Sequence, residues 1–256
     1  MLTVTRIIAT ALLATAVGLF LDLIAKSTTP APAAARKAVI VELFTSEGCS
    51  SCPPADALLG ELRHGPAAGV EIIPLGFHVD YWNHLGWQDR FSSSAYSRRQ
   101  EDYARRFRIN GPYTPQMVVD GAEEFVGNAE RRASAAIAHA ASQPAAADVQ
   151  LSWAGPEKLD VGVSAPGLNS GDVLLAVTED NLSTQVAAGE NNGRALRHFA
   201  VVRDFKRLGR VKNGAFAAGV PLKMEKDWKR NDLRVVVFVQ APDEGRIAGA
   251  AALALR

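Results

Sequence analysis

Apolar and polar positions alternate along the chain in two different ways, one in each half. In the first half, apolar runs of strand length are separated by segments that carry apolar residues at helical spacing. The expected strands are 38–44, 70–79, 116–120 and 125–126, and the expected helices are 53–63, 92–108 and 128–140. This alternation of strands and helices predicts an α/β domain.

The second half consists of short apolar segments separated by turn signals. Residues 141–147 are rich in alanine, with serine and proline, and predict a linker. The expected strands beyond it are 149–153, 159–164, 173–178, 200–203, 233–240 and 247–255. Short strands with regular turns predict a β-sandwich or a β-barrel, and we favour the sandwich. We therefore expect an α/β domain over residues 37–145 and a β-sandwich domain over residues 148–256.

The N-terminal segment has a separate pattern. Arg6 precedes an apolar run from Ile7 to Leu21, and small residues with prolines continue to Ala35. This pattern predicts a signal peptide within residues 1–35, or an uncleaved N-terminal anchor in the inner membrane. Either reading makes the rest of the chain periplasmic or secreted, and therefore exposed to an oxidising compartment.

The charge balance limits the kinds of partner. The chain has 28 basic and 27 acidic residues, and loss of residues 1–35 removes two basic and one acidic residue, which leaves 26 of each. A net charge near zero argues against a general nucleic-acid role. We expect contact with a membrane only if the N-terminal segment is uncleaved.

Two cysteines, Cys49 and Cys52, carry the main chemical signal. They lie three residues apart, where an expected strand gives way to an expected helix. Residues at this spacing can form a disulfide, and the helix N-terminus would stabilise a thiolate on Cys49. Cys52 would then resolve a mixed disulfide. A purely structural bridge that closes so short a loop contributes only about 2 kcal/mol, so we favour thiol-disulfide exchange with a protein or small thiol and no cofactor.

Three segments together resemble the thioredoxin superfamily: residues 39–44, the cysteine turn, and Thr114-Pro115. The resemblance implies a thioredoxin-like domain in which Pro115 is a cis-proline beside the cysteines and Thr114 contacts the substrate. It also implies that Glu42 is a buried acid that exchanges a proton with Cys52. A Glu42 side chain exposed at the strand end is the alternative.

Longer motifs resemble an exported bacterial family catalogued as domain of unknown function 1223. The motifs are residues 41–56, 78–82, 85–87 and 113–119. The resemblance implies a thioredoxin-like fold, export, and a β-rich C-terminal part. It implies no substrate.

The aromatic connector after the second strand supports further readings. Tyr81 and Trp82 are expected either to face the substrate or to cover an edge of the sheet. Cys49, Cys52 and His78 could instead bind copper or zinc in a periplasmic metal-binding protein, because thiolates and imidazole suit these ions. The chain lacks the second cysteine pair of a closed tetrahedral zinc site. A third reading is a non-catalytic interaction protein on a thioredoxin scaffold.

Overall fold

The computed structural model describes residues 37–63 and 69–255. These described residues belong to one compact unit. The signal or anchor expected within residues 1–35 lies outside the described residues. In the part of the chain that is described, no helix is long and apolar enough to cross a membrane.

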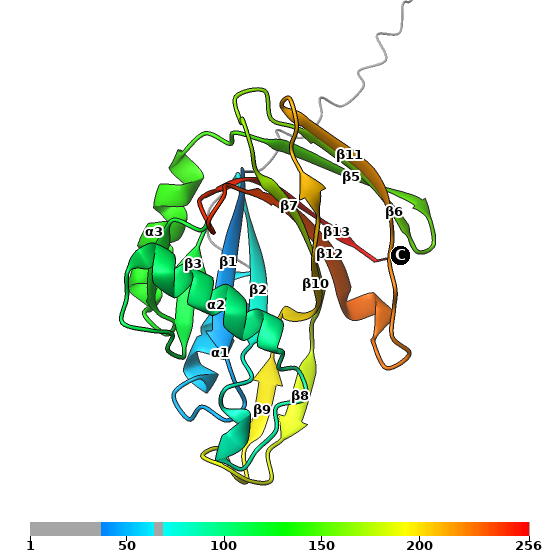
Figure 1. Cartoon of the computed structure of the whole chain (residues 1–256). Coiled ribbons are helices and arrows are strands. Elements are labelled where there is room, and N and C mark those ends of the chain that lie inside the picture. The colour runs from blue at the N-terminus through cyan, green and yellow to red at the C-terminus, as the bar shows by residue number, and fades with distance from the viewer. Residues whose placement is uncertain (1–36, 64–68, 256) are drawn as a thin grey trace, which may run out of the picture. The chain divides into compact units, whose positions relative to one another are not determined.

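The unit is a mixed α/β structure with few helices (Figure 1). Its described helices are α1 (Pro53–Leu62), α2 (Ser94–Phe107) and α3 (Glu130–Ser142), with the 3₁₀ helices η1 (Asn83–Leu85) and η2 (Arg230–Asp232). Its described strands are β1 (Lys37–Thr45), β2 (Val70–His78), β3 (Gln116–Val119), β4 (Glu123–Val126), β5 (Asp148–Gly155), β6 (Lys158–Ser164), β7 (Asp172–Glu179), β8 (Leu182–Gln185), β9 (Ala195–His198), β10 (Val201–Arg210), β11 (Ala215–Pro221), β12 (Leu233–Gln240) and β13 (Ile247–Ala254). The α/β expectation for the first half is therefore confirmed at this level.

One large sheet contains strands from both halves of the chain. Its order is β13-β12-β7-β10-β2-β1-β3-β4, with β1 parallel to β2 and antiparallel to β3. The halves join where β10 meets β2, and only Val201 and Gly76 pair there. The amide of Gly76 donates to the carbonyl of Ala200 at 2.8 Å. A Cβ on Gly76 would lie 3.0 Å from the carbonyl oxygen of Phe199, so glycine permits this close approach.

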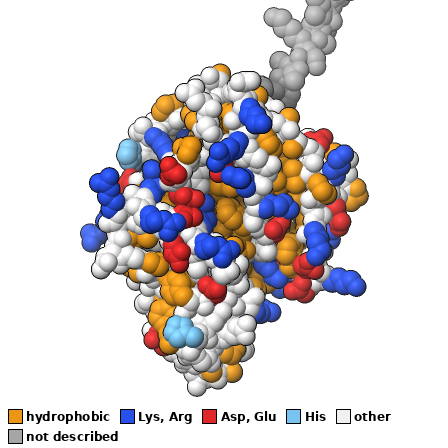
Figure 2. Space-filling model, in the orientation of Figure 1, with side chains coloured by type: hydrophobic (Ala, Val, Ile, Leu, Met, Phe, Trp, Pro, Cys, Tyr) orange, Lys and Arg blue, Asp and Glu red, His pale blue; other side chains and the backbone are white. Residues whose placement is uncertain are grey.

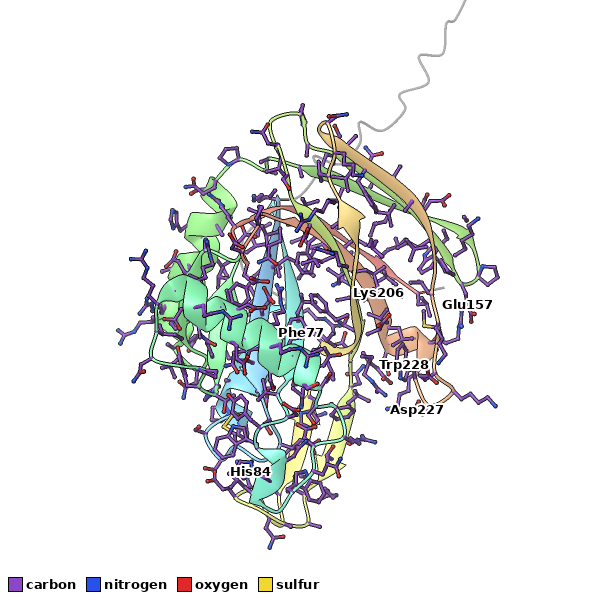
Figure 3. All side chains as sticks on the ribbon, in the orientation of Figure 1. Phe77, His84, Glu157, Lys206, Asp227 and Trp228 are labelled. Carbon is purple, nitrogen blue, oxygen red and sulfur yellow. A yellow bond between two sulfur atoms is a disulfide. The ribbon has the colours of Figure 1, made fainter. Side chains whose placement is uncertain are left out.

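The hydrophobic core also crosses the boundary that the sequence predicts between residues 145 and 148. Helix α2 covers one face of the sheet, and its Tyr96 packs edge-to-face on Phe77 with ring centroids 5.2 Å apart. Phe77, labelled in Figure 3, lies at the same centroid distance from Phe205 of β10. Phe205 in turn stacks on Phe238 of β12. The two ranges thus share a sheet and part of one core.

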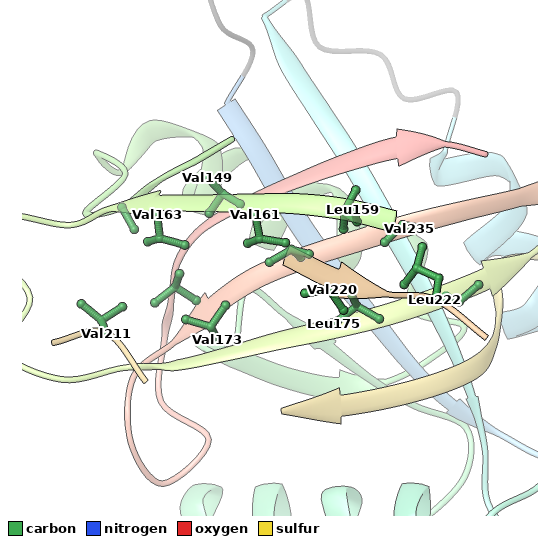
Figure 4. Close-up of a cluster of buried hydrophobic side chains, with 14 of the residues drawn as sticks. Val149, Leu159, Val161, Val163, Val173, Leu175, Val211, Val220, Leu222 and Val235 are labelled. Carbon is green, nitrogen blue, oxygen red and sulfur yellow. The ribbon is translucent and has the colours of Figure 1, made fainter. Parts of the chain in front are cut away.

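The opposite face of the sheet carries two other packing layers. Val39, Val41 and Leu43 of β1 face α1 and α3, because successive side chains of a strand point to opposite faces. Farther along the sheet, the three-stranded sheet β11-β6-β5 packs on β7 and β12. Figure 4 shows this second core, in which Val161 of β6 lies near Leu175 of β7.

The sequence pattern did not predict every strand. The pair β8-β9 and strand β11 were not expected, and β10 continues to Arg210 instead of ending at residue 203. Arginines of β10 pair with carboxylates of β7: Arg210 lies 2.7 Å from Asp172, and Arg203 pairs with Glu179. Figure 2 accordingly shows basic and acidic side chains interspersed over the visible face.

Candidate functional site

The cysteine turn lies between β1 and α1. Cys49 and Cys52 form a disulfide with their Cα atoms 5.4 Å apart, and Cys52 occupies the N-cap position of α1. Ser50 and Ser51 are exposed, whereas both cysteine residues are 0% exposed. The predicted pair therefore exists as a disulfide at the start of a helix, but its sulfur atoms are covered.

A buried carboxyl group lies one helical turn beyond the disulfide. The amide of Asp56 donates to the carbonyl of Cys52 at 3.1 Å, and residues four apart on a helix share a face. Burial raises the pKa of Asp56 to about 6, although His78 and His198 act in the opposite direction. Sequence reasoning missed Asp56, and its spacing of four residues from Cys52 was the available signal.

Two buried histidine-carboxylate pairs accompany Asp56. His78 ends β2, and its Nδ1 lies 2.6 Å from Oδ2 of Asp89. Burial alone would lower the pKa of His78, but the carboxylates of Asp89, Asp56 and Glu47 together outweigh burial, and the pKa is raised. Burial likewise acts to raise the pKa of Asp89, and the neighbouring His78 reverses this and lowers it. His78 is thus held towards its charged form by an ionised partner.

The second pair brings β9 of the C-terminal half beneath the cysteine turn. Nε2 of His198 lies 3.1 Å from Oε1 of Glu47, and the indole of Trp87 donates to Oε2 at 2.8 Å. Burial favours a higher pKa for Glu47, but its hydrogen bonds, chiefly to His198, lower the pKa. Asp89 also accepts a hydrogen bond from the Glu47 amide at 2.9 Å, which links the two pairs. A pocket of about 370 Å³ borders Glu47 and Trp87.

The structure brings Trp82 and Thr114 together beside the cysteine turn. The Thr114–Pro115 peptide bond is cis, which confirms that part of the expectation. The indole of Trp82 donates to Oγ1 of Thr114 at 2.8 Å, and a Cβ on Gly48 would lie 3.1 Å from Cβ of Trp82. Tyr81 also lies near Thr114: its hydroxyl donates to Gln100 of α2 at 3.1 Å, and burial raises its pKa to about 12, against the opposing effects of Thr114 and Gln100.

Glu42 lies on the wrong face of the sheet for its expected role. Its carboxylate accepts hydrogen bonds from Nε of Arg99 at 2.5 Å and from the hydroxyl of Tyr103 at 2.5 Å, both on α2. Helix α1 packs on the other face, against Val41 and Leu43. Because strand side chains alternate, a shift of one residue decides which helix a side chain meets. The expected exchange of a proton between Glu42 and Cys52 is corrected on this ground.

The residues of the alternative metal site have other partners in the structure, because Cys49 and Cys52 form a disulfide with each other. His78, which the sequence offered as a third ligand, pairs through Nδ1 with Asp89. Within residues 37–63 and 69–255, no group of three or more His, Cys, Asp or Glu side chains is arranged to hold a metal ion. His84, labelled in Figure 3, lies on η1 and is exposed.

The fold and the site define a mixed α/β protein with a disulfide turn above a cluster of buried carboxyls and histidines. The chain belongs to the family described as "Protein of unknown function (DUF1223)", whose model matches residues 40–240. The resemblance to this family is therefore confirmed.

Two solved structures are similar to the chain. Protein AGR_C_4864 from Agrobacterium tumefaciens is 27% identical, with 85% of this chain and 94% of that chain covered and a TM-score of 0.71. HBP35 of Porphyromonas gingivalis is 18% identical, with 86% and 76% covered and a TM-score of 0.61, and this likeness shows the fold alone. No curated protein matches the chain.

Proposed function

We propose that this protein is an exported thiol-disulfide oxidoreductase that acts through Cys49 and Cys52. The observation that carries the proposal is the disulfide at the N-terminus of α1, with the buried carboxyl of Asp56 on the same face of that helix. A helix N-terminus stabilises a thiolate, and a buried acid can hold the proton that disulfide exchange moves.

We further infer a thioredoxin-like domain over residues 37–145 and a β-sandwich over residues 148–256 that share one sheet. The order β2-β1-β3-β4 supports the first inference, together with α1 and α3 on one face and α2 on the other. The packing of β11-β6-β5 on β7 and β12 supports the second.

The reaction exchanges one disulfide for another, so atoms and electrons balance within the pair of reactants. A thiolate of a partner dithiol attacks Sγ of Cys49, the bond to Cys52 breaks, and Cys52 leaves as a thiolate that takes up a proton. The second partner thiol gives up its proton, attacks the mixed disulfide and releases Cys49. Two electrons have then passed from the partner to this protein, and the reverse sequence returns them.

Asp56 takes the role that the sequence assigned to Glu42. Because its pKa is raised to about 6, the carboxyl can release a proton to the leaving thiolate of Cys52 and recover it near neutral pH. Trp82 and Thr114 form the side of the cysteine turn where a partner chain would lie. No dissociable cofactor takes part in this scheme.

Trapping of mixed disulfides tests the proposal. A Cys52→Ala variant retains Cys49 but has no resolving thiol, so partner proteins should remain covalently attached to Cys49. Cys49→Ser is the matched control and should capture nothing. Equal capture by the two variants, or none by either, argues for the non-catalytic interaction protein.

A metal measurement tests the alternative that Cys49, Cys52 and His78 bind copper or zinc. The reduced protein is mixed with each ion in turn, and metal stoichiometry is compared with the rate of disulfide exchange. We expect exchange that does not depend on metal. Tight one-to-one binding together with no exchange would overturn the oxidoreductase proposal.

A further inference from the structure

The buried state of the disulfide sets a requirement on the proposed reaction. Cys49 and Cys52 are each 0% exposed, although the two serines between them reach solvent. A thiolate must approach the sulfur it attacks, and exchange rates depend on that access. Some element around the cysteine turn must therefore move before the disulfide can react.

The loop between β8 and β9, residues 186–194, binds the main chain of the cysteine turn, and we name this loop the clasp. The side-chain amide of Asn191 donates to the carbonyl of Glu47 and to the carbonyl of Cys49, each at 2.9 Å. The carboxylate of Glu190 accepts a hydrogen bond from the amide of Ser50 at 3.0 Å. Three hydrogen bonds from the C-terminal half of the chain thus hold residues 47–50.

The clasp is ordered around Asn191. This side chain is 0% exposed, and its oxygen accepts a hydrogen bond from Nη1 of Arg194 at 2.7 Å. A Cβ on Gly189, which has a φ of +72°, would lie 3.2 Å from Cβ of Trp87. Asn191 is therefore aimed at the cysteine turn from a fixed position, and its neighbour Asn192 is exposed.

The strands that carry the clasp pair only with each other within the described structure. β8 and β9 form a two-stranded sheet of four residues each, separate from the large sheet. An isolated two-stranded ribbon is marginally stable, and local opening occurs first where few strands support each other. β1, which leads into the cysteine turn, is by contrast paired on both sides.

We propose that the clasp is a gate on the disulfide and that Asn191 is the positioning residue that keeps it closed. Release of Asn191 and Glu190 frees the main chain of residues 47–50 and exposes Cys49 to an attacking thiolate. The biological role of this gate rests on the proposed oxidoreductase function. Whether the clasp limits access to the Cys49–Cys52 disulfide is a separate question, which the rate of reduction by a small reductant answers.

The test measures the rate constant for reduction of the Cys49–Cys52 disulfide by tris(2-carboxyethyl)phosphine in the full chain. The phosphine attacks one sulfur, breaks the bond and leaves as its oxide after reaction with water, so two electrons pass to two thiols. Asn191→Ala removes the two hydrogen bonds that Asn191 donates to the cysteine turn. We therefore expect the rate constant for reduction to rise about tenfold. The matched control Asn192→Ala should stay within about twofold of the wild-type protein.

A second pair of variants keeps the test decisive if Asn191→Ala does not fold. Glu190 is exposed, so its replacement is tolerated more easily. Glu190→Ala removes the acceptor for the Ser50 amide, and we expect about a threefold faster reduction. Glu190→Gln retains an oxygen acceptor and should remain near the wild-type rate.

The dependence on phosphine concentration separates a gate from general loosening. If opening precedes reduction, the wild-type rate levels off at high phosphine at the opening rate of the clasp, and Asn191→Ala raises that plateau. A linear dependence with equal rates in all variants refutes the gate. If Cys52→Ala traps partners but all variants are reduced by the phosphine at equal rates, the gate is refuted and the oxidoreductase proposal stands. If the reduction rates show a gate but Cys52→Ala captures no partner, the oxidoreductase proposal is refuted and the gate stands.

Discussion

Replacement of Asp56 by asparagine should make the stability of the protein less dependent on pH. Burial raises the pKa of the Asp56 carboxyl from 3.8 to about 6 in the folded protein. The folded state therefore binds this proton more tightly than the unfolded chain does. The stability gained from that proton is complete below pH 3.8 and is lost as the pH rises through about 6.

The size of the effect follows from the difference in pKa. A difference of about 2 between the folded and unfolded states corresponds to about 3 kcal/mol, since each pKa unit is worth about 1.36 kcal/mol. Asparagine has a similar shape and does not titrate. At pH 4.5 the unfolded carboxyl is already mostly ionised, so about 2 kcal/mol of this difference lies between pH 4.5 and pH 8. The free energy of unfolding of Asp56→Asn, relative to that of the wild-type protein, should therefore be higher at pH 8 than at pH 4.5 by about 2 kcal/mol.

Urea unfolding followed by tryptophan fluorescence at pH 4.5 and pH 8 measures this difference. Asp160→Asn is the matched control, because Asp160 is exposed on β6, and its effect should be within about 0.5 kcal/mol at both pH values. If Asp56→Asn changes the free energy of unfolding by the same amount at both pH values, the carboxyl does not titrate as described. That result would falsify the reasoning from burial.

The same variant should exchange disulfides more slowly. Without the carboxyl, the leaving thiolate of Cys52 lacks its proton donor, and the loss of such a group costs about 100-fold in rate. At pH 8, Asp56→Asn should thus gain stability relative to the wild-type protein but exchange disulfides more slowly. If the role of Asp56 is purely structural, the folded Asp56→Asn variant should exchange disulfides as fast as the wild-type protein. Equal exchange rates would therefore remove Asp56 from the mechanism.

Two further changes test the core. Arg99→Met leaves the buried carboxylate of Glu42 without its cation and should lower the free energy of unfolding by about 3–5 kcal/mol, measured by urea denaturation; a loss below about 0.5 kcal/mol contradicts this. Gly60→Ala places a Cβ 2.7 Å from the ring of Phe199 and should cost about 1–3 kcal/mol. Gly155→Ala, which meets no atom within 4 Å, is the control for thermal unfolding, and equal midpoints for the two variants contradict the overlap.

The periodicity of the first half was enough to place its elements. Strand 38–44, helix 53–63 and strand 70–79 correspond to β1, α1 and β2, because apolar period and proline position are local properties. The cysteine spacing also located the disulfide. The many charged residues of β10 hid most of that strand from the sequence pattern, and Arg207 and Arg210 find their partner Asp172 across the sheet, on β7.

The candidate site was predicted in part, and its errors have a common cause. The resemblance to the thioredoxin superfamily implied the role of Glu42, but strand alternation turns this side chain towards Arg99. Asp56 was overlooked although it lies one helical turn from Cys52. Which helix a buried carboxyl meets, and whether it pairs with an arginine as Glu42 does, depends on which face of the sheet each helix covers, and sequence distance does not encode this.

The sequence by itself determined the local elements, the disulfide turn and the family. These follow from short-range spacing of apolar residues, glycines, prolines and cysteines. Only the tertiary structure decided that both halves share one sheet, that His198 lies beside Glu47, and that Asn191 binds the main chain at Cys49. Such contacts join residues from the two halves of the chain, and they form because the buried faces of β10 and α2 find a common core that no local pattern specifies.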